Sequence, residues 1–260
     1  MKILVTGSKG YIAKKIIKSL SSFEVESINR DNFNLVDKEQ TDNFFKDKNY
    51  DLVIHTAIQG GSRLKPENEE TFFNNLKMFY NIIDNKNHFK KFISLGSGAE
   101  IHSIDSYYGL SKKIINDVIT NNKNFYNVRI FGLFDHDEWE SRFIKSNINR
   151  YINKQDIIIH QDKFMDFFYM DDLLQIINNI ANGVETSNLI ECCYGKKYKL
   201  SDIAKIINNL DHHKVNIKIE NNNPGKDYIG GEYKKFNVVG IEKGIQTTYK
   251  KILINTGNNI

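Results

Sequence analysis

Cysteine, proline and long apolar runs are scarce in this sequence. Only two of its 260 residues are cysteines and two are prolines; Cys192 and Cys193 are adjacent, so they cannot close a loop and lack the spacing of a zinc site. This cysteine usage is typical of a reducing compartment. No apolar run approaches the ~18 residues that a membrane span needs, and the first strand leads into Gly7 instead of a cleavable apolar segment. We therefore expect a cytoplasmic protein with no membrane partner.

A bias of charge is also absent. The chain carries 36 Lys and Arg against 32 Asp and Glu, a formal charge of +4, and its lysines are scattered among acidic residues and asparagines. The sequence therefore does not favour nucleic-acid binding. His212 and His213 lie next to Asp211 without any further ligand pattern, so we predict no metal site.

Short β-branched runs alternate with segments of helical periodicity through the first half of the chain. Predicted strands cover 2–6, 23–28, 51–55, 89–95 and 128–131, and predicted helices cover 11–20, 39–46, 68–85 and 105–120. This alternation predicts an α/β fold, a doubly wound parallel (Rossmann) sheet with helices on both faces. Beyond Phe134 the alternation of strands and helices is less regular. Helices are predicted near 141–151, 171–181, 201–210 and 241–253, and strands near 157–159, 189–193 and 215–219. We predict a dinucleotide-binding domain over 1–160 and a small C-terminal substrate-binding lobe over 161–260, from which a strand and a helix cross back.

A glycine turn joins the first strand to the first helix. Gly7 permits a tight turn and Gly10 lets backbone amides approach a pyrophosphate, so the turn favours dinucleotide binding by Gly7, Ser8, Lys9, Gly10, Tyr11 and Ile12. At the end of the second strand, where an NAD enzyme usually has an acid, the chain has Arg30. Arg30 is a suitable clamp for a 2′-phosphate and favours NADP over NAD, although an exposed arginine beside Asp31 is the alternative.

A serine, a tyrosine and a lysine form the candidate catalytic group. Tyr108 and Lys112 are one helical turn apart on the same face, and a lysine beside a tyrosine favours the phenolate. Tyr107 competes with Tyr108, but only Tyr108 has the one-turn spacing from Lys112. Ser97 ends the fourth strand, whose carboxyl edge faces the same crevice, and can donate a hydrogen bond to a substrate carbonyl.

This combination resembles the extended short-chain dehydrogenase/reductase family that acts on nucleotide sugars, also called the NAD-dependent epimerase/dehydratase family. The segments 30–37, 55–61 and 95–97 are most similar to GDP-fucose synthase-like keto-sugar reductases, and the resemblance weakens after Phe134. It implies that Ser97, Tyr108 and Lys112 are the catalytic residues and that a homodimer forms through helices that include the Tyr108 helix. It also implies a cofactor site that contains Leu35, Val36, Asp37, Thr56, Ala57 and Ile58, with Asn75 in a structural position on a helix.

The sequence departs from this family at three places. Fucose synthases have a Cys shortly after the catalytic Ser and a His in the following helix, where this chain has Ala99 and the region of Arg142, so epimerisation is doubtful. Met165 occupies the usual position of a substrate-binding Arg. Substrate phosphates would then contact Arg142, Lys145 or Lys163, and Trp139 would stack on a base or pack in a lid. Glu100 and His102 either line the sugar pocket or lie in an exposed loop.

From these features we predict an NADP(H)-dependent 4-ketoreductase of a keto-deoxy nucleotide sugar, a cytoplasmic oxidoreductase of carbohydrate biosynthesis. The nearest alternative is a nucleotide-sugar epimerase with tightly bound NAD, which would use the same three residues. A further alternative is a non-catalytic NADP-binding sensor, but the intact Ser97, Tyr108 and Lys112 argue against it.

Overall fold

The computed structural model describes residues 1–61, 66–184, 186–231 and 237–256. Its contacts divide the chain into unit 1, Met1–Arg129 with Ile176–Ile190, and unit 2, Ile130–Gln175 with Glu191–Ile260. Within the described ranges, no helix has both the length and the apolar character needed to cross a bilayer. The functional division at residue 160 stays a prediction.

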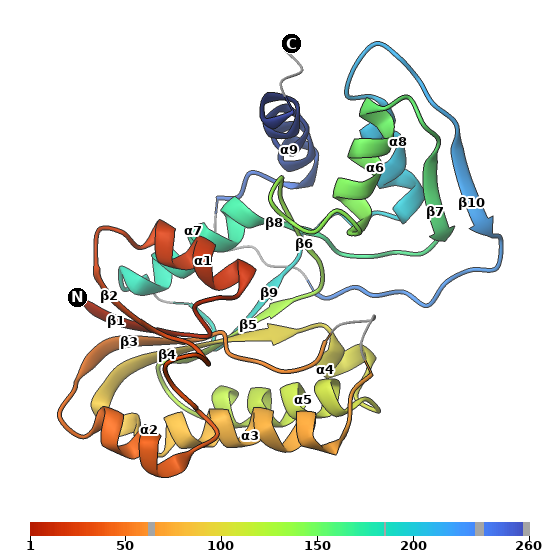
Figure 1. Cartoon of the computed structure of the whole chain (residues 1–260). Helices are drawn as coiled ribbons and strands as arrows, with labels where there is room; N and C mark the ends of the chain where they lie inside the picture. The colour runs from red at the N-terminus through yellow and green to blue at the C-terminus, as the bar shows by residue number, and fades with distance from the viewer. Residues whose placement is uncertain (62–65, 185, 232–236, 257–260) are drawn as a thin grey trace. The chain divides into compact units, whose positions relative to one another are not determined.

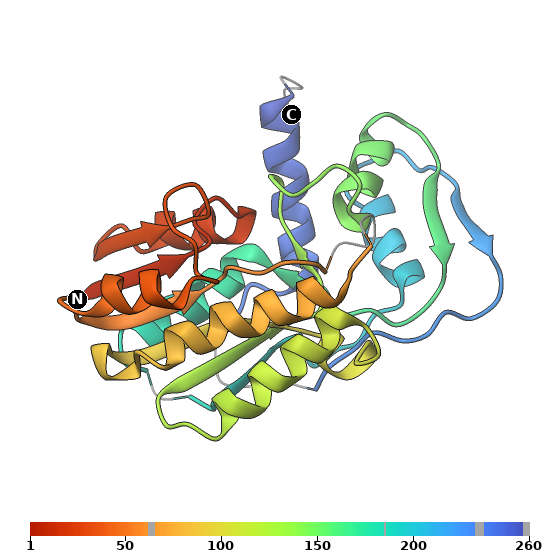
Figure 2. The same cartoon turned by 60° about the horizontal axis from the view of Figure 1, so that its bottom comes forward.

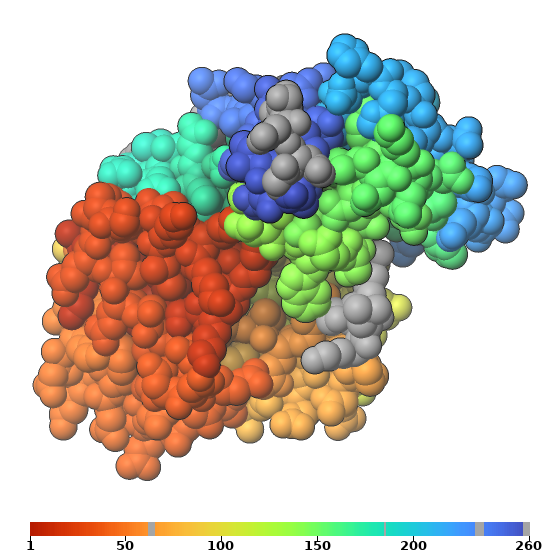
Figure 3. All heavy atoms as spheres, turned by 45° about the horizontal axis from the view of Figure 1, so that its top comes forward, coloured from red at the N-terminus to blue at the C-terminus, as the bar shows by residue number. Residues whose placement is uncertain are grey.

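Unit 1 is built around a six-stranded sheet. In chain order its elements are β1 (Lys2–Thr6), α1 (Tyr11–Ser19), β2 (Glu24–Ile28), α2 (Lys38–Phe45), β3 (Tyr50–His55), α3 (Glu69–Ile83), η1 (Lys86–His88), β4 (Phe89–Ser97), α4 (Ala99–His102), α5 (Tyr107–Thr120) and β5 (Phe125–Ile130), followed by part of α7 (Met170–Ala181) and of β9 (Leu189–Cys192). The strand order is β2-β1-β3-β4-β5-β9. Figure 1 shows α2, α3 and α5 on one face of the sheet and α1 with α7 on the other, and the first helices and loops (red to orange) form one continuous surface in Figure 3.

The central strands are parallel, so their carboxyl ends meet at one edge. Thr6 pairs with Ile28 on β2 and with His55 on β3, and His55 pairs with Ser94 on β4. The interior residues of β3 are fully buried, as expected for a parallel sheet covered on both faces. This arrangement confirms the predicted doubly wound α/β fold and puts the ends of β1, β3 and β4 next to one another.

Polar caps set where the helices of unit 1 begin. Asp37 accepts a hydrogen bond from the Gln40 amide at 3.0 Å and caps α2, and Asn68 and Thr71 form a capping box on α3. Ser106 accepts from the Gly109 amide at 2.9 Å and caps α5. The predicted helix start at Asp105 is therefore wrong by two residues, because α5 begins only after its serine cap.

Unit 2 has its own hydrophobic core. Its elements are β6 (Leu133–Phe134), α6 (Phe143–Ile152), β7 (Ile157–Gln161), β8 (Phe168–Tyr169), the start of α7, α8 (Leu200–Asn208), β10 (Ile217–Asn221) and α9 (Ile241–Asn255). Isoleucines of α6, α8 and α9 pack together with Tyr151 and Tyr249. The strand expected from Val215 begins at Ile217, because the Val215 amide donates to Asn208 Oδ1 at 2.9 Å and belongs to the loop after α8.

Candidate active site

The glycine turn lies where the strand order reverses, between β1 and β3. Gly7 has φ +69°, and a Cβ there would lie 2.8 Å from the backbone N and Cα of Ala57, so only glycine fits. Thr56 Oγ1 donates to the Thr6 carbonyl at 2.6 Å, and the Ala57 amide donates to Thr6 Oγ1 at 3.3 Å. The structure thus brings the predicted residues of β1 and β3 together at the switch point, where sheets of this kind bind ligands.

The first turn of α1 fits a pyrophosphate. The Gly10 amide donates to the Gly7 carbonyl at 2.9 Å, which closes the turn that leads into Tyr11 and Ile12. Gly10 caps α1 without a side-chain hydrogen bond, and the first turn contains no acidic residue. Amide donors and the positive end of the helix dipole are therefore not countered by a carboxylate of this turn, which suits an anion.

Five polar residues surround the end of β2. Ser8 Oγ accepts from Asn29 Nδ2 at 3.3 Å, and Lys9 forms an ion pair with Asp31. Arg30 is exposed and makes no hydrogen bond or ion pair with the residues that the structure describes. Of these two cations, Lys9 is therefore already paired, whereas the guanidinium of Arg30 is available.

The remaining predicted cofactor residues have different structural roles. Leu35 is buried and its carbonyl accepts from Asn81 Nδ2 at 2.8 Å, Val36 is half-buried, and Asp37 uses its carboxylate to cap α2. Asn75 is fully buried on α3 and has a structural role as the resemblance implies: its amide exchanges hydrogen bonds with the backbone of Gln59 at 2.8 and 3.0 Å.

Asn75 also connects the segment around Gln59 to α5. Its Nδ2 lies 3.1 Å from Ser111 Oγ on α5, and half-buried Ile58 precedes the Gln59 that it holds. Asn75 therefore fixes the chain after β3 against α3 and α5.

Ser97, Tyr108 and Lys112 lie in unit 1 on β4 and α5. Ser97 Oγ accepts from the Ala99 amide at 3.2 Å, so its own hydroxyl hydrogen is available to a substrate. The Lys112 ammonium lies 5.9 Å from the ring centroid of Tyr108 and donates to the Leu95 carbonyl of β4. The competing residue, Tyr107, is exposed at the first position of α5. The geometry therefore favours Tyr108 as the partner of Lys112.

Burial controls the charges near Lys112. It lowers the pKa of Lys112 to about 8, and the negative charge of Glu100 opposes this shift. His55, at the end of β3, has its pKa lowered to about 3, first by burial and then by the positive charge of Lys112. At neutral pH His55 is therefore uncharged and Lys112 is the cation of this group.

A carboxylate that the sequence patterns did not indicate binds the backbone of Tyr108. Glu67 accepts from the Gly61 amide through Oε1 at 2.9 Å and from the Tyr108 amide through Oε2 at 3.0 Å. Gly61 has φ +75°, and a Cβ there would lie 2.9 Å from Tyr108 Cζ. The Gly60-Gly61 pair was the only sequence signal for this close approach.

The structure supports neither of the two alternatives for Glu100. Its side chain is buried and receives hydrogen bonds from Ser97, Asn127 and Arg129, so it lies neither in an exposed loop nor on the surface of a sugar pocket. His102, two residues further on, is half-buried.

The predicted substrate residues all belong to unit 2. Trp139 is 61% exposed, and its carbonyl accepts from the amide of Arg142, which precedes α6. Lys145 is buried, pairs with Glu140 at 2.7 Å and donates to the Glu138 carbonyl at 2.8 Å, so its ammonium is already engaged. Lys163 is half-buried in the segment between β7 and β8, apart in sequence from the other three.

Unit 2 also contains a group of potential metal ligands, in which the side-chain ligand atoms of Asp135, His136 and Asp137 lie within 4.8 Å of one another. These three consecutive residues already bond among themselves, because the Asp137 amide donates to Asp135 Oδ1 at 2.7 Å and His136 Nε2 lies 3.3 Å from Asp137 Oδ1. We assign no metal to them.

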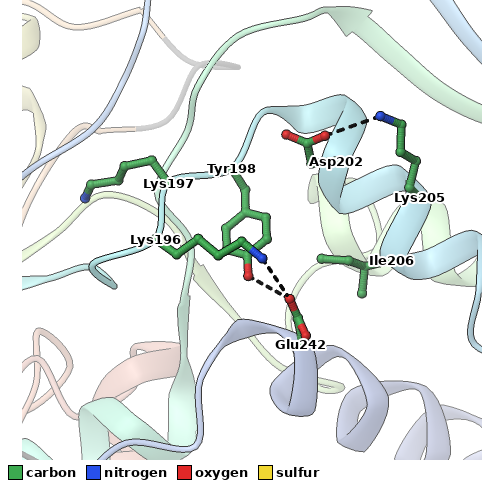
Figure 4. Close-up of a pocket in the computed structure, with 7 residues that line it drawn as sticks. All are labelled: Lys196, Lys197, Tyr198, Asp202, Lys205, Ile206 and Glu242. Atoms are coloured by element: carbon green, nitrogen blue, oxygen red, sulfur yellow. Dashed lines mark hydrogen bonds and ion pairs between the residues drawn. The ribbon is translucent and has the colours of Figure 1, made fainter.

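A pocket of unit 2 is lined by Lys196, Lys197, Tyr198, Asp202, Lys205, Ile206 and Glu242 (Figure 4). Glu242 pairs with Lys196 at 3.3 Å and accepts from the Tyr198 hydroxyl at 2.8 Å, and Asp202 pairs with Lys205 at 3.4 Å. The charged side chains of this pocket largely compensate one another. We therefore take the residues of unit 1 as the candidate catalytic site.

The chain resembles known proteins in sequence and in fold. Residues 3–188 match the NAD dependent epimerase/dehydratase family. The chain is 24% identical to GDP-L-colitose synthase of Yersinia pseudotuberculosis over the full length of both proteins. Its fold resembles that of a GDP-mannoheptose C4 reductase from Campylobacter jejuni with NADP bound (TM-score 0.77, 15% identity, 96% of this chain and 97% of the other). It also resembles a UDP-glucuronic acid 4-epimerase from Bacillus cereus in complex with NAD (TM-score 0.77, 16% identity, 98% and 100%).

Proposed function

The chain belongs to the NAD dependent epimerase/dehydratase family, and from this premise we propose that it is an NADP(H)-dependent 4-ketoreductase of a keto-deoxy nucleotide sugar. Membership confirms the predicted resemblance and makes the protein a nicotinamide-dependent enzyme of the extended short-chain dehydrogenase/reductase type. The observation that supports the proposal is that Ser97 on β4 and Tyr108 and Lys112 on α5 belong to the same unit as the glycine turn, with the Lys112 ammonium 5.9 Å from the ring centroid of Tyr108.

Each catalytic residue has a role that follows from its surroundings. When bound, the reduced nicotinamide supplies the hydride. Ser97 donates its hydroxyl hydrogen to the ketone oxygen, and Tyr108 gives the proton that converts this oxygen to an alcohol. The Lys112 ammonium lies 5.9 Å from the ring of Tyr108, where its charge stabilises the phenolate left behind. Gly7, Gly10 and the amide end of α1 would hold the pyrophosphate.

Arg30 supports NADP as the cofactor. Its exposed guanidinium lies at the end of β2, the place where the adenosine ribose is recognised in this kind of sheet. A guanidinium can bind a phosphate through two parallel hydrogen bonds, whereas an NAD enzyme needs an acceptor for the 2′-hydroxyl there. NADP is bound to the reductase from Campylobacter jejuni and NAD to the epimerase from Bacillus cereus, so both remain choices within this fold.

Unit 2 would supply the nucleotide-sugar contacts. Trp139 offers an exposed aromatic face to a base, and Arg142 and Lys163 are the candidate cations for the diphosphate. Lys145 is a weaker candidate, because its ammonium is bound to Glu140 and to the Glu138 carbonyl. The relatives include GDP-L-colitose synthase and a GDP-mannoheptose C4 reductase, which supports a nucleotide sugar as substrate.

Epimerisation at C3 or C5, the carbons beside the ketone, needs an acid and a base on opposite faces of the sugar. The position at which fucose synthases have a Cys holds Ala99, which is buried and has no ionisable group. Arg142 cannot act as a base, because its guanidinium stays protonated. We therefore retain reduction without epimerisation as the proposed reaction.

Two helices of unit 1 support the proposed homodimer. Phe73 and Tyr80 are exposed on α3, and Tyr107 and Leu110 are exposed on α5. The two helices contact each other and lie side by side in Figure 2. Exposed aromatic and leucine side chains on two adjacent helices are typical of a surface that a second subunit covers. A cytoplasmic location is part of the proposal, since both cysteines are free and buried.

Activity on defined substrates tests the function. The purified protein is mixed with NADPH and a panel of GDP- and UDP-linked 4-keto-6-deoxy sugars, and the loss of absorbance at 340 nm is followed. We expect oxidation of NADPH with at least one ketone and a single alcohol product. A parallel incubation in D₂O without NADPH should leave C3 and C5 free of deuterium. Enzyme-dependent deuterium at either carbon would show epimerisation beside the ketone, and tight binding of NADPH without turnover of any ketone would favour the sensor.

A further inference from the structure

Glu100 lies directly behind the proposed catalytic serine. It belongs to the short helix α4, and its side chain is 1% exposed. Its Oε1 accepts from the backbone amide of Ser97 at 2.8 Å. A Cβ on residue 96 would lie 2.5 Å from this oxygen, so Gly96 provides the space that the carboxylate occupies.

The other carboxylate oxygen is bound by two side chains of β5. Oε2 accepts from Arg129 Nε at 2.8 Å and from Asn127 Nδ2 at 3.0 Å. Asn127 Nδ2 also donates to Asn116 Oδ1 on α5 at 2.7 Å. Glu100 therefore connects the end of β4 to β5 and to the helix that carries Tyr108 and Lys112.

Only the ionised form of Glu100 suits these partners. Both oxygens face N–H donors, so a protonated carboxyl would direct its O–H toward a donor. Burial raises the pKa of Glu100, while the charge of Arg129 and the hydrogen bond from the Ser97 amide oppose that rise. The buried ion pair with Arg129 supplies the compensation that a buried carboxylate requires.

Lys112 and Glu100 both bind the end of β4, because the Lys112 ammonium donates to the Leu95 carbonyl and Glu100 Oε1 accepts from the Ser97 amide. The ring centroid of Tyr108 lies 5.9 Å from the same ammonium, and the charge of Lys112 lowers the pKa of His55 on β3. His55 is buried and neutral. Glu100, whose carboxylate is bound by N–H donors, is thus the anion of this group, and its charge counteracts the effect of burial on the pKa of Lys112.

We propose that Glu100 is a positioning residue that fixes the Ser97 segment and, through its negative charge, keeps Lys112 in the ammonium form. The effect on turnover rests on the proposed reductase function. The effect on the charge of Lys112 does not, because that charge is measurable without any substrate.

Two variants of Glu100 and one matched control test this proposal in the full-length protein. Glu100→Gln removes the charge, and Glu100→Asp keeps the charge but shortens the side chain. Glu26→Gln is the control: Glu26 is also a paired carboxylate of unit 1, bound to Lys48 and to the Tyr50 hydroxyl, but it lies on β2, which β1 and β3 separate from β4. Urea unfolding first establishes that each variant is folded.

The charge of Lys112 is measured by NMR titration of protein labelled at lysine Cε, with Lys112→Met identifying the resonance. In Glu100→Gln we expect the Lys112 titration to move down by about one pH unit, the size of effect that a nearby opposite charge exerts. Glu26→Gln should leave it unchanged. An equal titration in wild type and Glu100→Gln would overturn the electrostatic part of the proposal, whether or not the protein reduces a ketone.

Turnover tests the positioning part. In Glu100→Asp the carboxylate no longer reaches the Ser97 amide, so kcat should fall ~10–100-fold with little change in the KM for NADPH. In Glu100→Gln the alkaline limb of the kcat/KM profile should move to lower pH by the same amount as the Lys112 titration. A wild-type kcat in Glu100→Asp would refute the positioning role. The Glu100→Asp variant also keeps this test available if Glu100→Gln does not fold.

Discussion

Replacing Gly61 by alanine should displace the phenol of Tyr108, the proposed proton donor, without changing any residue of the proposed catalytic group. A Cβ on residue 61 would lie 2.9 Å from Tyr108 Cζ, the atom that carries the hydroxyl, whereas ordinary contact begins at 3.4 Å. The ring or the loop must therefore move by about 0.5 Å, and the bond from the Gly61 amide to Glu67 resists movement of the loop. Since a misplacement of ~1 Å costs up to ~100-fold in rate, we expect kcat to fall ~10–100-fold.

Gly183→Ala is the matched control for the backbone. Gly183 also belongs to unit 1 and has φ +84°, but the nearest atom to a Cβ there is Lys91 Nζ at 3.8 Å. Both variants should lose ~1–2 kcal/mol of unfolding free energy from the left-handed backbone alone, as measured by urea unfolding. Only Gly61→Ala should lose turnover in initial-rate assays of NADPH oxidation. If Gly61→Ala turns over as fast as Gly183→Ala, the loop does not position Tyr108.

Three further predictions concern single side chains. Tyr108→Phe should lower kcat by ~10²–10⁴-fold while leaving the Kd for NADPH, measured by fluorescence titration, close to that of the wild type, because only the proton donor is lost; near-normal turnover would exclude Tyr108 from this role. Arg30→Ala should weaken NADPH ~10-fold or more with little effect on NADH, and an equal loss for both cofactors would show that Arg30 does not contact the 2′-phosphate. Burial raises the pKa of Glu138 from 4.5 to about 8, so the native state retains a proton that the unfolded chain releases, and the free energy of unfolding falls as pH rises from 5 to 8. Glu138→Gln should remove this slope and raise stability at pH 7 by up to ~3 kcal/mol in urea unfolding; an unchanged slope would contradict it.

The parts of the site that follow from strand order were predictable from the sequence. Parallel strands end at one edge, so Gly7 after β1 and Thr56 and Ala57 after β3 were expected to meet, and the structure places them in contact. The one-turn spacing of Tyr108 and Lys112 selected one face of α5 in the same way, because helical periodicity is a local property.

The carboxylates that support this site were not predictable in the same way. Glu67 binds Tyr108 across a loop, and Glu100 turns inward from a helix of four residues, which is too short to show a periodic pattern. Their roles depend on which direction a side chain takes in an irregular segment and on space left by distant glycines, Gly61 and Gly96. The spacing of residues along the sequence shows neither the direction of such a side chain nor the space that a distant glycine leaves.

The charge arrangement of unit 1 suits donation of a single proton. A second cation beside Lys112 would repel its ammonium, and the burial of His55 keeps that imidazole neutral. Glu100 and Arg129 form a buried pair of opposite charges, so the negative charge that supports Lys112 is itself compensated. Tyr108 is then the proposed proton donor of this set, because the charge left on its phenol would be stabilised by the neighbouring ammonium. One donor suffices for the proposed reduction of a ketone, whereas inversion at a carbon beside the ketone would require a second ionisable group on the opposite face of the sugar.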